Sequence, residues 1–476
     1  MEESSEKVKS YRFSFAGGQH ASSHVSSHSL PKGYLLDVIN VCILLAVLLV
    51  IDYTSPLHQR FVALGDSDIF TLAGKIWAEG GIPYVDYWDH KGPLIFFTNL
   101  LGAWLGDNGV FWVDFVLLVV SMVIFRHTAT ILSGLSTVFR QEIITLVTMA
   151  WVIRLLQPGM DMTETVCLPF LAASLYTMLL QLNNFNRNNN YNVFMLTAFV
   201  QGLAFAACLM TRVTNGVAVC TATLILTVIV CAHAQWRNLL ICIVSFIVGF
   251  AVLVAPFSIY FGMHGSFGEM VYATITYNLS YAQGSTGGIY AGIIITFLIF
   301  FVPLAMILMS IFSMICSRTI SVIDGFVLIT GIAFAALYIR SEPYQHYAVV
   351  SAVFIPLLAS QLYSLEVRRM PIVLKKTTDM LMIVVFVLLA CSSAALCVRD
   401  AERRPVYENP TVEQLANLSN NNIVIYDRSD SSSAIAYLKY GITPAYRFAN
   451  LQEWQGSFSE QYRTLLLKEF STNKAE

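Results

Sequence analysis

Apolar runs long enough to cross a membrane recur from Gly33 to Val398, and they limit the folds open to this chain more than any other feature. Many contain about 20 residues, which as a helix cross a hydrocarbon core of about 30 Å. Of the 476 residues, 56% are hydrophobic and only 12% are charged, about half the charged share of a soluble domain. Period-2 alternation, the mark of a transmembrane barrel, is absent. We therefore expect an all-α polytopic membrane protein.

The hydropathy pattern predicts about eleven transmembrane helices, which form one domain over residues 33–398. Their approximate cores are 34–53, 109–126, 141–156, 165–182, 193–211, 214–233, 238–261, 290–316, 322–339, 346–364 and 378–398. The shorter apolar segment 94–105 is predicted to be a helix that lies at the interface. Residues 1–32 are rich in Ser, His and charge, and are expected to form a disordered tail, with a loop at 183–192.

Lysine and arginine residues in the short connections set the expected orientation. With the N-terminus in the cytoplasm, the strongest basic cluster, at 368–376, stays inside. The 54–93 loop, the 262–289 loop and the C-terminal tail then lie outside. Because the net charge is −2 and the pI is near 6.5, nothing indicates a nucleic-acid partner.

The composition changes at Arg399, where the last predicted span has ended. Asn422–Tyr426 has the pattern of a strand, Ser432–Tyr440 that of a short helix, and Gly441–Pro444 that of a turn. Residues 399–476 are therefore expected to form a small extracytoplasmic α/β segment.

Ionisable residues are concentrated in the first predicted external loop, in GDSDIF at 65–70 and GGIPYVDYWDHKGP at 80–93. They are Asp66, Asp68, Asp86, Asp89, His90 and Lys91. Charged groups beside lipid cost free energy, so such a cluster is a functional-site hypothesis. Structural roles remain open as well, because Asp66 and Asp68 also suit the start of a helix and Lys91 can pair with Asp89.

Further polar residues fall on the same predicted face of the membrane: Glu164, Arg212, Arg340 and His346. A carboxylate such as Asp66 or Glu164 can act as a general base, and arginine and lysine can bind a phosphate. Each also has a structural alternative, since Glu164 follows the helix cap Thr163 and an arginine can lie at the interface. No Walker loop and no zinc-ligand spacing is present.

The run GDSDIF … AEGGIPYVDYWDHKGPLIFF resembles the first extracytoplasmic loop of the GT-C fold glycosyltransferases. That superfamily includes the protein O-mannosyltransferases and the lipid A aminoarabinose transferase. Met162-Thr163-Glu164 is similar to its second acidic site, and Arg212–Asn215 and Tyr344–Tyr347 look like further recurring elements. The resemblance extends from about residue 34 to residue 364, and more weakly to Tyr446–Phe448.

The resemblance implies an inverting transfer of a monosaccharide from a polyprenyl-phosphate donor to a cell-envelope glycan, glycolipid or protein. It makes Asp66 the essential carboxylate, assisted by Glu164. The residues that it assigns to the donor phosphate and sugar are Lys91, Arg212, Arg340, His346, Tyr84 and Asp86. The bacterial branch implies a plasma (inner) membrane location. Because Ser67 stands where many relatives have a second acid, a divalent metal (Mg²⁺ or Mn²⁺) at Asp66 stays an open alternative.

Two other functions remain as alternatives at this point. A transporter or flippase of lipid-linked glycans needs polar residues near the bilayer midplane, whereas the ionisable residues here cluster at one interface. A polysaccharide polymerase would share the external site and the lipid phosphate.

Overall fold

The structure of this protein is a computed structural model that describes residues 32–188, 193–280, 292–317, 321–369, 372–418, 422–425, 432–449, 457 and 459–472. The predicted disordered tail up to residue 31 lies outside the described residues. The same holds for most of the predicted 183–192 loop after Asn188 and for residues 281–291 of the second external loop.

Each predicted span coincides with helical structure. The corresponding elements are α1 (Lys32–Ile51), α4 (Gly109–Ile131), α5 (Val138–Leu156), α6 (Thr163–Asn188), α7 (Met195–Leu209), η2 and α8 (Val213–Gly216 and Val217–Ala232), α9 (Trp236–Met263), α12 (Ile293–Ser317), α13 (Val322–Arg340), η4 and α14 (Gln345–Phe354 and Ile355–Arg369) and α15 (Ile372–Arg403). The predicted interfacial segment is α3 (Pro93–Leu105). The all-α membrane architecture is thus confirmed.

Within the described ranges, nine helical segments are long and apolar enough to cross a membrane, fewer than the eleven expected. The two that differ are α5 and α7. Helix α5 carries Arg140, Glu142 and Arg154, and α7 has only 15 residues. A helix of 15 residues is about 22 Å long, which is shorter than the hydrocarbon core. Both are enclosed by neighbouring helices, and α7 packs along α9.

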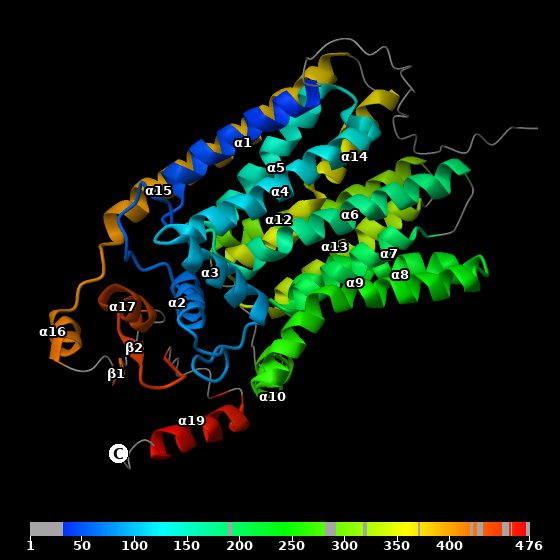
Figure 1. The fold of residues 1–476 in the computed structure, drawn as a ribbon. Coiled ribbons are helices and arrows are strands. Elements are labelled where there is room, and N and C mark those ends of the chain that lie inside the picture. Colours follow the sequence, from blue (N-terminus) through cyan, green and yellow to red (C-terminus); the bar gives the residue numbers. More distant parts are fainter. Residues whose placement is uncertain are drawn as a thin grey trace, which may run out of the picture.

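Helix α6 lies at the centre of the bundle, where it contacts α4, α7, α8 and η4 (Figure 1). In its most apolar window 78% of the residues are buried, against 11% in α9 and in α15. The exposed apolar side chains of α9 and α15 therefore face the lipid, and α6 is shielded from it. This places the first turn of α6, which carries Glu164, inside the protein.

The remaining elements gather at one end of the bundle, as Figure 1 shows. They are α2 (Asp66–Ala78), α10 (Phe267–Val271), η3 (Tyr272–Tyr277), α16 (Pro410–Leu418), α17 (Ser432–Tyr440), α19 (Glu460–Thr472) and the strands β1 (Asn422–Ile423) and β2 (Thr443–Pro444). The short helix η1 (Ser133–Leu135) lies apart from them, against α14, α4 and α5. Apart from η1, all belong to segments predicted to share one membrane face. The helix predicted at Ser432–Tyr440 is α17, with the same bounds.

The two strands form a small parallel pair, with Asn422 opposite Thr443 and Ile423 opposite Pro444. The predicted turn at Gly441–Pro444 therefore ends in a strand. Helix α17 packs against α2, and the segment after α15 pairs with the first loop through the Val62–Val406 bridge. The C-terminal elements thus contact the loop that carries the predicted site.

Ion pairs tie the helices together at the opposite end of the bundle. Arg126 of α4 binds Asp37 at 3.3 Å and Glu142 at 2.8 Å, and Arg140 binds Asp379 at 3.0 Å. Arg126 lies 17 residues after the start of α4, about 25 Å along the helix. The charged groups therefore occupy two separate layers at the two ends of the membrane helices.

Candidate functional site

The N-terminus of α2 separates the roles of its two aspartates. The carboxylate of Asp68 accepts hydrogen bonds from the backbone N–H groups of Leu64 at 2.7 Å and Gly65 at 3.2 Å. Asp68 thereby closes the first turn, and its burial raises its pKa to about 7. Gly65, at φ 81°, supplies the left-handed turn that this closure requires. Within the described part of the chain, no hydrogen bond or ion pair engages the half-buried Asp66 carboxylate.

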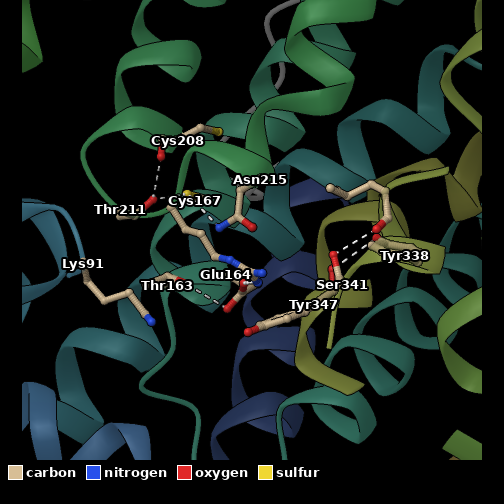
Figure 2. Close-up of polar contacts among 12 residues, drawn as sticks. Lys91, Thr163, Glu164, Cys167, Cys208, Thr211, Asn215, Tyr338, Ser341 and Tyr347 are labelled. Atoms are coloured by element: carbon tan, nitrogen blue, oxygen red, sulfur yellow. Dashed lines mark hydrogen bonds and ion pairs between the residues drawn. The ribbon is translucent and has the colours of Figure 1, made fainter. Parts of the chain in front are cut away.

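Glu164 and Arg212 form a buried ion pair at the start of α6. Glu164 is 0% exposed, and its Oε1 lies 3.3 Å from Nη1 of Arg212. Its Oε2 accepts a hydrogen bond of 2.9 Å from the hydroxyl of Thr163 (Figure 2). The Arg212 guanidinium lies 3.3 Å from the ring centroid of Tyr347. Arginine is thus fixed by a carboxylate on one side and by an aromatic face on the other.

His346 lies next to this pair, in η4. Its ring meets the Tyr347 ring edge-on at 4.7 Å and stacks on Tyr344 at 5.7 Å. Four charged side chains are near enough to act on it electrostatically: Glu164, Asp66, Arg212 and Lys91. The structure thus brings together five predicted site residues that lie on five separate segments of the chain.

Lys91 reaches the site from the segment between α2 and α3. Its Nζ lies 2.7 Å from Nε2 of His90, and its backbone N–H donates to Asp89 at 2.9 Å. Burial lowers the pKa of His90 well below its usual value, as does the charge of Lys91, so the ring is neutral and accepts from the ammonium. Figure 2 shows the Lys91 side chain extending toward the region of Glu164.

The backbone holds Lys91 beside Arg212. The N–H of Gly92 donates to the carbonyl of Thr211 at 2.9 Å, and the N–H of Leu94 donates to the carbonyl of Met210 at 2.9 Å. A Cβ on Gly92 would overlap the Met210 backbone, so only glycine permits this approach. Two cations are therefore positioned by direct contact between the first loop and the end of α7.

The structure does not bring the other three predicted donor residues into this cluster. Tyr84 is fully buried and packs on Phe96 and Phe261, while its hydroxyl donates to the Lys91 carbonyl at 2.8 Å. Asp86 is exposed and accepts from the backbone of Ile82 at 2.7 Å. Arg340 is exposed at the last turn of α13. Tyr84 and Asp86 thus shape the loop itself.

One residue that shapes the site was missing from the sequence interpretation. Asp161 is 1% exposed, and it accepts hydrogen bonds from Asn99 at 2.9 Å and from Ser67 at 3.3 Å. It joins α3 and the first turn of α2 to the loop that leads to Glu164. The signal available was its position three residues before Glu164 in an otherwise apolar stretch. Ser67, which replaces the second acid, serves here as a hydrogen-bond donor.

The described residues do not form a metal site. No group of three or more His, Cys, Asp or Glu side chains in the described ranges is close enough to hold an ion. Asp66 adjoins Ser67 and the capping Asp68, whose oxygens already accept backbone hydrogen bonds. The donor set around Asp66 therefore does not match the several oxygen ligands that Mg²⁺ or Mn²⁺ takes.

Comparison with known proteins identifies the fold. No protein-family model and no curated protein matches the sequence. Among solved structures, ArnT from Cupriavidus metallidurans, bound to undecaprenyl phosphate, matches with a TM-score of 0.52 and 13% identity, over 91% of this chain and 89% of ArnT. The archaeal oligosaccharyltransferase AglB from Archaeoglobus fulgidus, in complex with an inhibitory peptide and a dolichol-phosphate, matches with a TM-score of 0.53 and 12% identity.

The AglB match covers 89% of this chain and 65% of AglB, so this chain spans about two thirds of the length of that protein. Both proteins have the GT-C membrane fold. The predicted GT-C architecture is therefore confirmed, and the chain is a multi-pass membrane protein with this fold.

Proposed function

We propose that this protein is a membrane glycosyltransferase that moves a monosaccharide from a polyprenyl-phosphate donor to an acceptor hydroxyl. The observation that carries the proposal is that the Asp66 carboxylate and two fixed cations, Lys91 and Arg212, all lie within electrostatic range of His346 at one end of a GT-C helix bundle. Both structural neighbours are described with a polyprenyl phosphate lipid, undecaprenyl phosphate in ArnT and a dolichol-phosphate in AglB.

The proposed reaction is an inverting displacement. The acceptor oxygen attacks the anomeric carbon, the bond from that carbon to the phosphate oxygen breaks, and the acceptor proton passes to the Asp66 carboxylate. Negative charge grows on the leaving phosphate, where Lys91 and Arg212 stabilise it. Glu164 positions Arg212, and His346 lies on the sugar side of the same cluster. Arg340, exposed at the end of α13, is proposed to meet the lipid phosphate only as it approaches.

The orientation follows from the same proposal. We place the cluster, the 54–93 loop and residues 399–476 on the extracytoplasmic side of the plasma membrane, and the N-terminus in the cytoplasm, as the basic connections predict. The acceptor is then a glycan, glycolipid or protein of the cell envelope.

Asp66→Asn tests this proposal most directly. The amide has the same size but accepts no proton, so we expect transfer to fall about 10²- to 10⁴-fold, with donor binding retained. The measurement uses membrane vesicles with a radiolabelled polyprenyl-phosphate sugar and follows label on the acceptor. Asp86→Asn, at an exposed aspartate of the same loop, is the matched control.

Near-normal transfer by Asp66→Asn would disprove the role of Asp66. Label that crosses the vesicle membrane without reaching any acceptor in the wild type would instead support a transporter.

A further inference from the structure

A cavity opens on the side of α2 that carries Ser67. It has a volume of about 540 Å³ and lies between the end of α1, the 58–64 segment, α2, the second half of α3 and α17. Pockets that bind small molecules have volumes of about 300–1,000 Å³, and this cavity lies within that range. The cavity lining does not include the clustered site residues, which are Asp66, Lys91, Glu164, Arg212 and His346.

The cavity wall on α2 is a polar stripe. Ser67, Thr71, Lys75 and Glu79 follow one another at intervals of four residues and all line the cavity. Residues four apart lie on one face of a helix. The stripe begins at Ser67, one residue after Asp66, so the cavity ends at the helix turn that carries the proposed base, although Asp66 itself does not line it.

The lining combines polar and charged groups with apolar side chains. Hydroxyl and amide groups come from Thr54, Ser55, Gln59, Ser67, Thr71, Asn99 and Asn108. Four of the ionisable side chains form two ion pairs, Arg60 with Asp107 at 2.6 Å and Lys75 with Glu79 at 3.9 Å, and Asp68 is held by the backbone N–H groups of Leu64 and Gly65. Groups that both donate and accept suit a ligand rich in hydroxyls, whereas a phosphate needs uncompensated cations and a lipid tail needs apolar walls.

Aromatic rings complete the wall. Tyr53 and His58 stack at 4.5 Å, and Trp104 is 66% exposed at the edge of the cavity. Exposed rings give sugar rings flat apolar surfaces to pack on, beside polar groups that fix orientation.

The backbone of Phe61, also in the lining, is strained. Phe61 has a φ of 62°, a region that non-glycine residues adopt at a free-energy cost. Its carbonyl accepts a hydrogen bond of 2.8 Å from the N–H of Tyr407, and the Arg60 guanidinium lies 4.9 Å from its ring centroid. Such strain is typical of ligand-binding segments that the surrounding structure holds in place.

We infer that this cavity binds the acceptor, and that the acceptor presents a carbohydrate with several free hydroxyl groups. The inference rests on the proposed function. The acceptor glycan lies along the polar stripe of α2, with the hydroxyl that reacts at the Ser67 end, on the helix turn that carries Asp66. The donor approaches the same carboxylate from the side of Lys91 and Arg212.

The test is a binding measurement that needs no donor. Full-length protein in nanodiscs is applied to an array of short neutral, amino and acidic oligosaccharides together with peptides. Wild type is expected to retain one class of oligosaccharide. Ala78→Trp, which fills the cavity, is expected to weaken this binding about tenfold or more, and Gln59→Ala several-fold. Ala401→Trp, on an exposed turn of α15 outside the cavity, is the matched control and is expected to bind as wild type does.

Retention of peptides alone, retention of nothing, or oligosaccharide binding that Ala78→Trp and Gln59→Ala leave unchanged would overturn the inference. The two proposals fail separately. Asp66→Asn keeps the cavity intact and is expected to bind the same oligosaccharides, so a fully active Asp66→Asn would remove the proposed base without affecting the glycan site.

Discussion

The buried pair of Glu164 and Arg212 decides how the guanidinium is presented. Glu164 has no access to solvent, and Arg212 also rests on the ring of Tyr347. Removing one charge of a buried ion pair is strongly destabilising, because the other charge is left buried without compensation. The pair is therefore a structural element, and it also orients Arg212, one of the two cations proposed to bind the phosphate.

Glu164→Gln separates these two contributions. The amide keeps the hydrogen bond from Thr163 but loses the charge, so Arg212 loses its ion pair and is held by the Tyr347 ring alone. We expect donor KM to rise about tenfold or more and the protein to lose about 3–5 kcal/mol of stability. Transfer kinetics with varied donor and thermal unfolding in detergent check the two effects.

Thr163→Ala is the control for the hydrogen bond alone and is expected to be milder, at about 1 kcal/mol. An unchanged donor KM in Glu164→Gln would show that Arg212 is held without Glu164.

Asp68 gives the stability of α2 a pH dependence. Its pKa is about 7 in the folded protein, against 3.8 as the ordinary value, because burial disfavours the charged form. Between these values the folded state binds the proton and the unfolded state does not. Stability from this group is therefore full below about pH 4 and is lost as the pH rises toward 7.

Asp68→Asn should remove that dependence. The amide oxygen still accepts from Leu64 and Gly65, and nothing titrates. Thermal unfolding from pH 4.5 to pH 7 is expected to show a slope reduced by up to about 1.4 kcal/mol per pH unit, in favour of the variant at neutral pH. Identical slopes in the two proteins would mean that Asp68 keeps an ordinary pKa.

The two buried aspartates, Asp68 and Asp161, differ in how far the sequence predicts their roles. The capping role of Asp68 was one of two open alternatives, and the decision needed the geometry of Leu64 and Gly65. Asp161 could not be predicted, because its partners Ser67 and Asn99 are 94 and 62 residues away. Hydrogen bonds over such separations leave no local pattern in a single sequence.

At the scale of helices, α7 and α9 depend on close backbone contact. A Cβ on Gly202 would overlap the Phe246 carbonyl oxygen, and one on Gly249 would overlap that of Phe199. Helices in lipid associate through packing of this kind, since lipid is as apolar as their side chains. This contact holds the short α7 in the bundle, and Arg212 follows directly after its end.

Gly202→Ala should push the two helices apart. We expect a loss of about 1–3 kcal/mol, measured by thermal unfolding in detergent, because the methyl group has no space. Gly262→Ala on α9 is the matched control, since a Cβ there meets nothing within 4 Å. Equal stability of the two variants would show that the α7–α9 contact tolerates separation.

The helices were predictable because an apolar run is a local property of the chain. Even the polar-rich α5 and the short α7 were placed, although neither qualifies as a span by itself. Of the two strands, β1 falls within the predicted strand Asn422–Tyr426, whereas β2 lies where a turn was predicted. β1 and β2 have two residues each and exist only by pairing across about 20 residues. A strand that short leaves almost no periodicity in the sequence.

At the scale of the whole molecule, the C-terminal elements stabilise the loop that carries Lys91. The ring of Trp88, in that loop, contacts the rings of Tyr462 and Phe448 at 4.7 and 5.6 Å. Its backbone N–H donates to the carbonyl of Arg447 at 2.7 Å. Contacts between residues more than 350 positions apart therefore hold this loop and the C-terminal elements together.

Arg447 is the centre of this contact. Its Nε lies 2.7 Å from Glu469, its Nη1 lies 3.7 Å from Glu269, and the same nitrogen donates to the Tyr84 carbonyl at 3.3 Å. One side chain thus joins α19, α10 and the first loop. Because Tyr84 in turn bonds the carbonyl of Lys91, the connection continues to the proposed phosphate site.

Arg447→Ala should therefore loosen the loop without touching the site. We expect faster proteolysis within residues 80–92 and a transfer rate lowered about tenfold, with the donor still bound, since Lys91 and Asp66 remain present but are less well held. Gln461→Ala, at an exposed position of α19, is the control and is expected to change neither measurement. Faster proteolysis with full activity would show that the loop positions Lys91 without help from the C-terminal elements. Unchanged proteolysis would show that the aromatic contacts of Trp88 alone hold the two parts together.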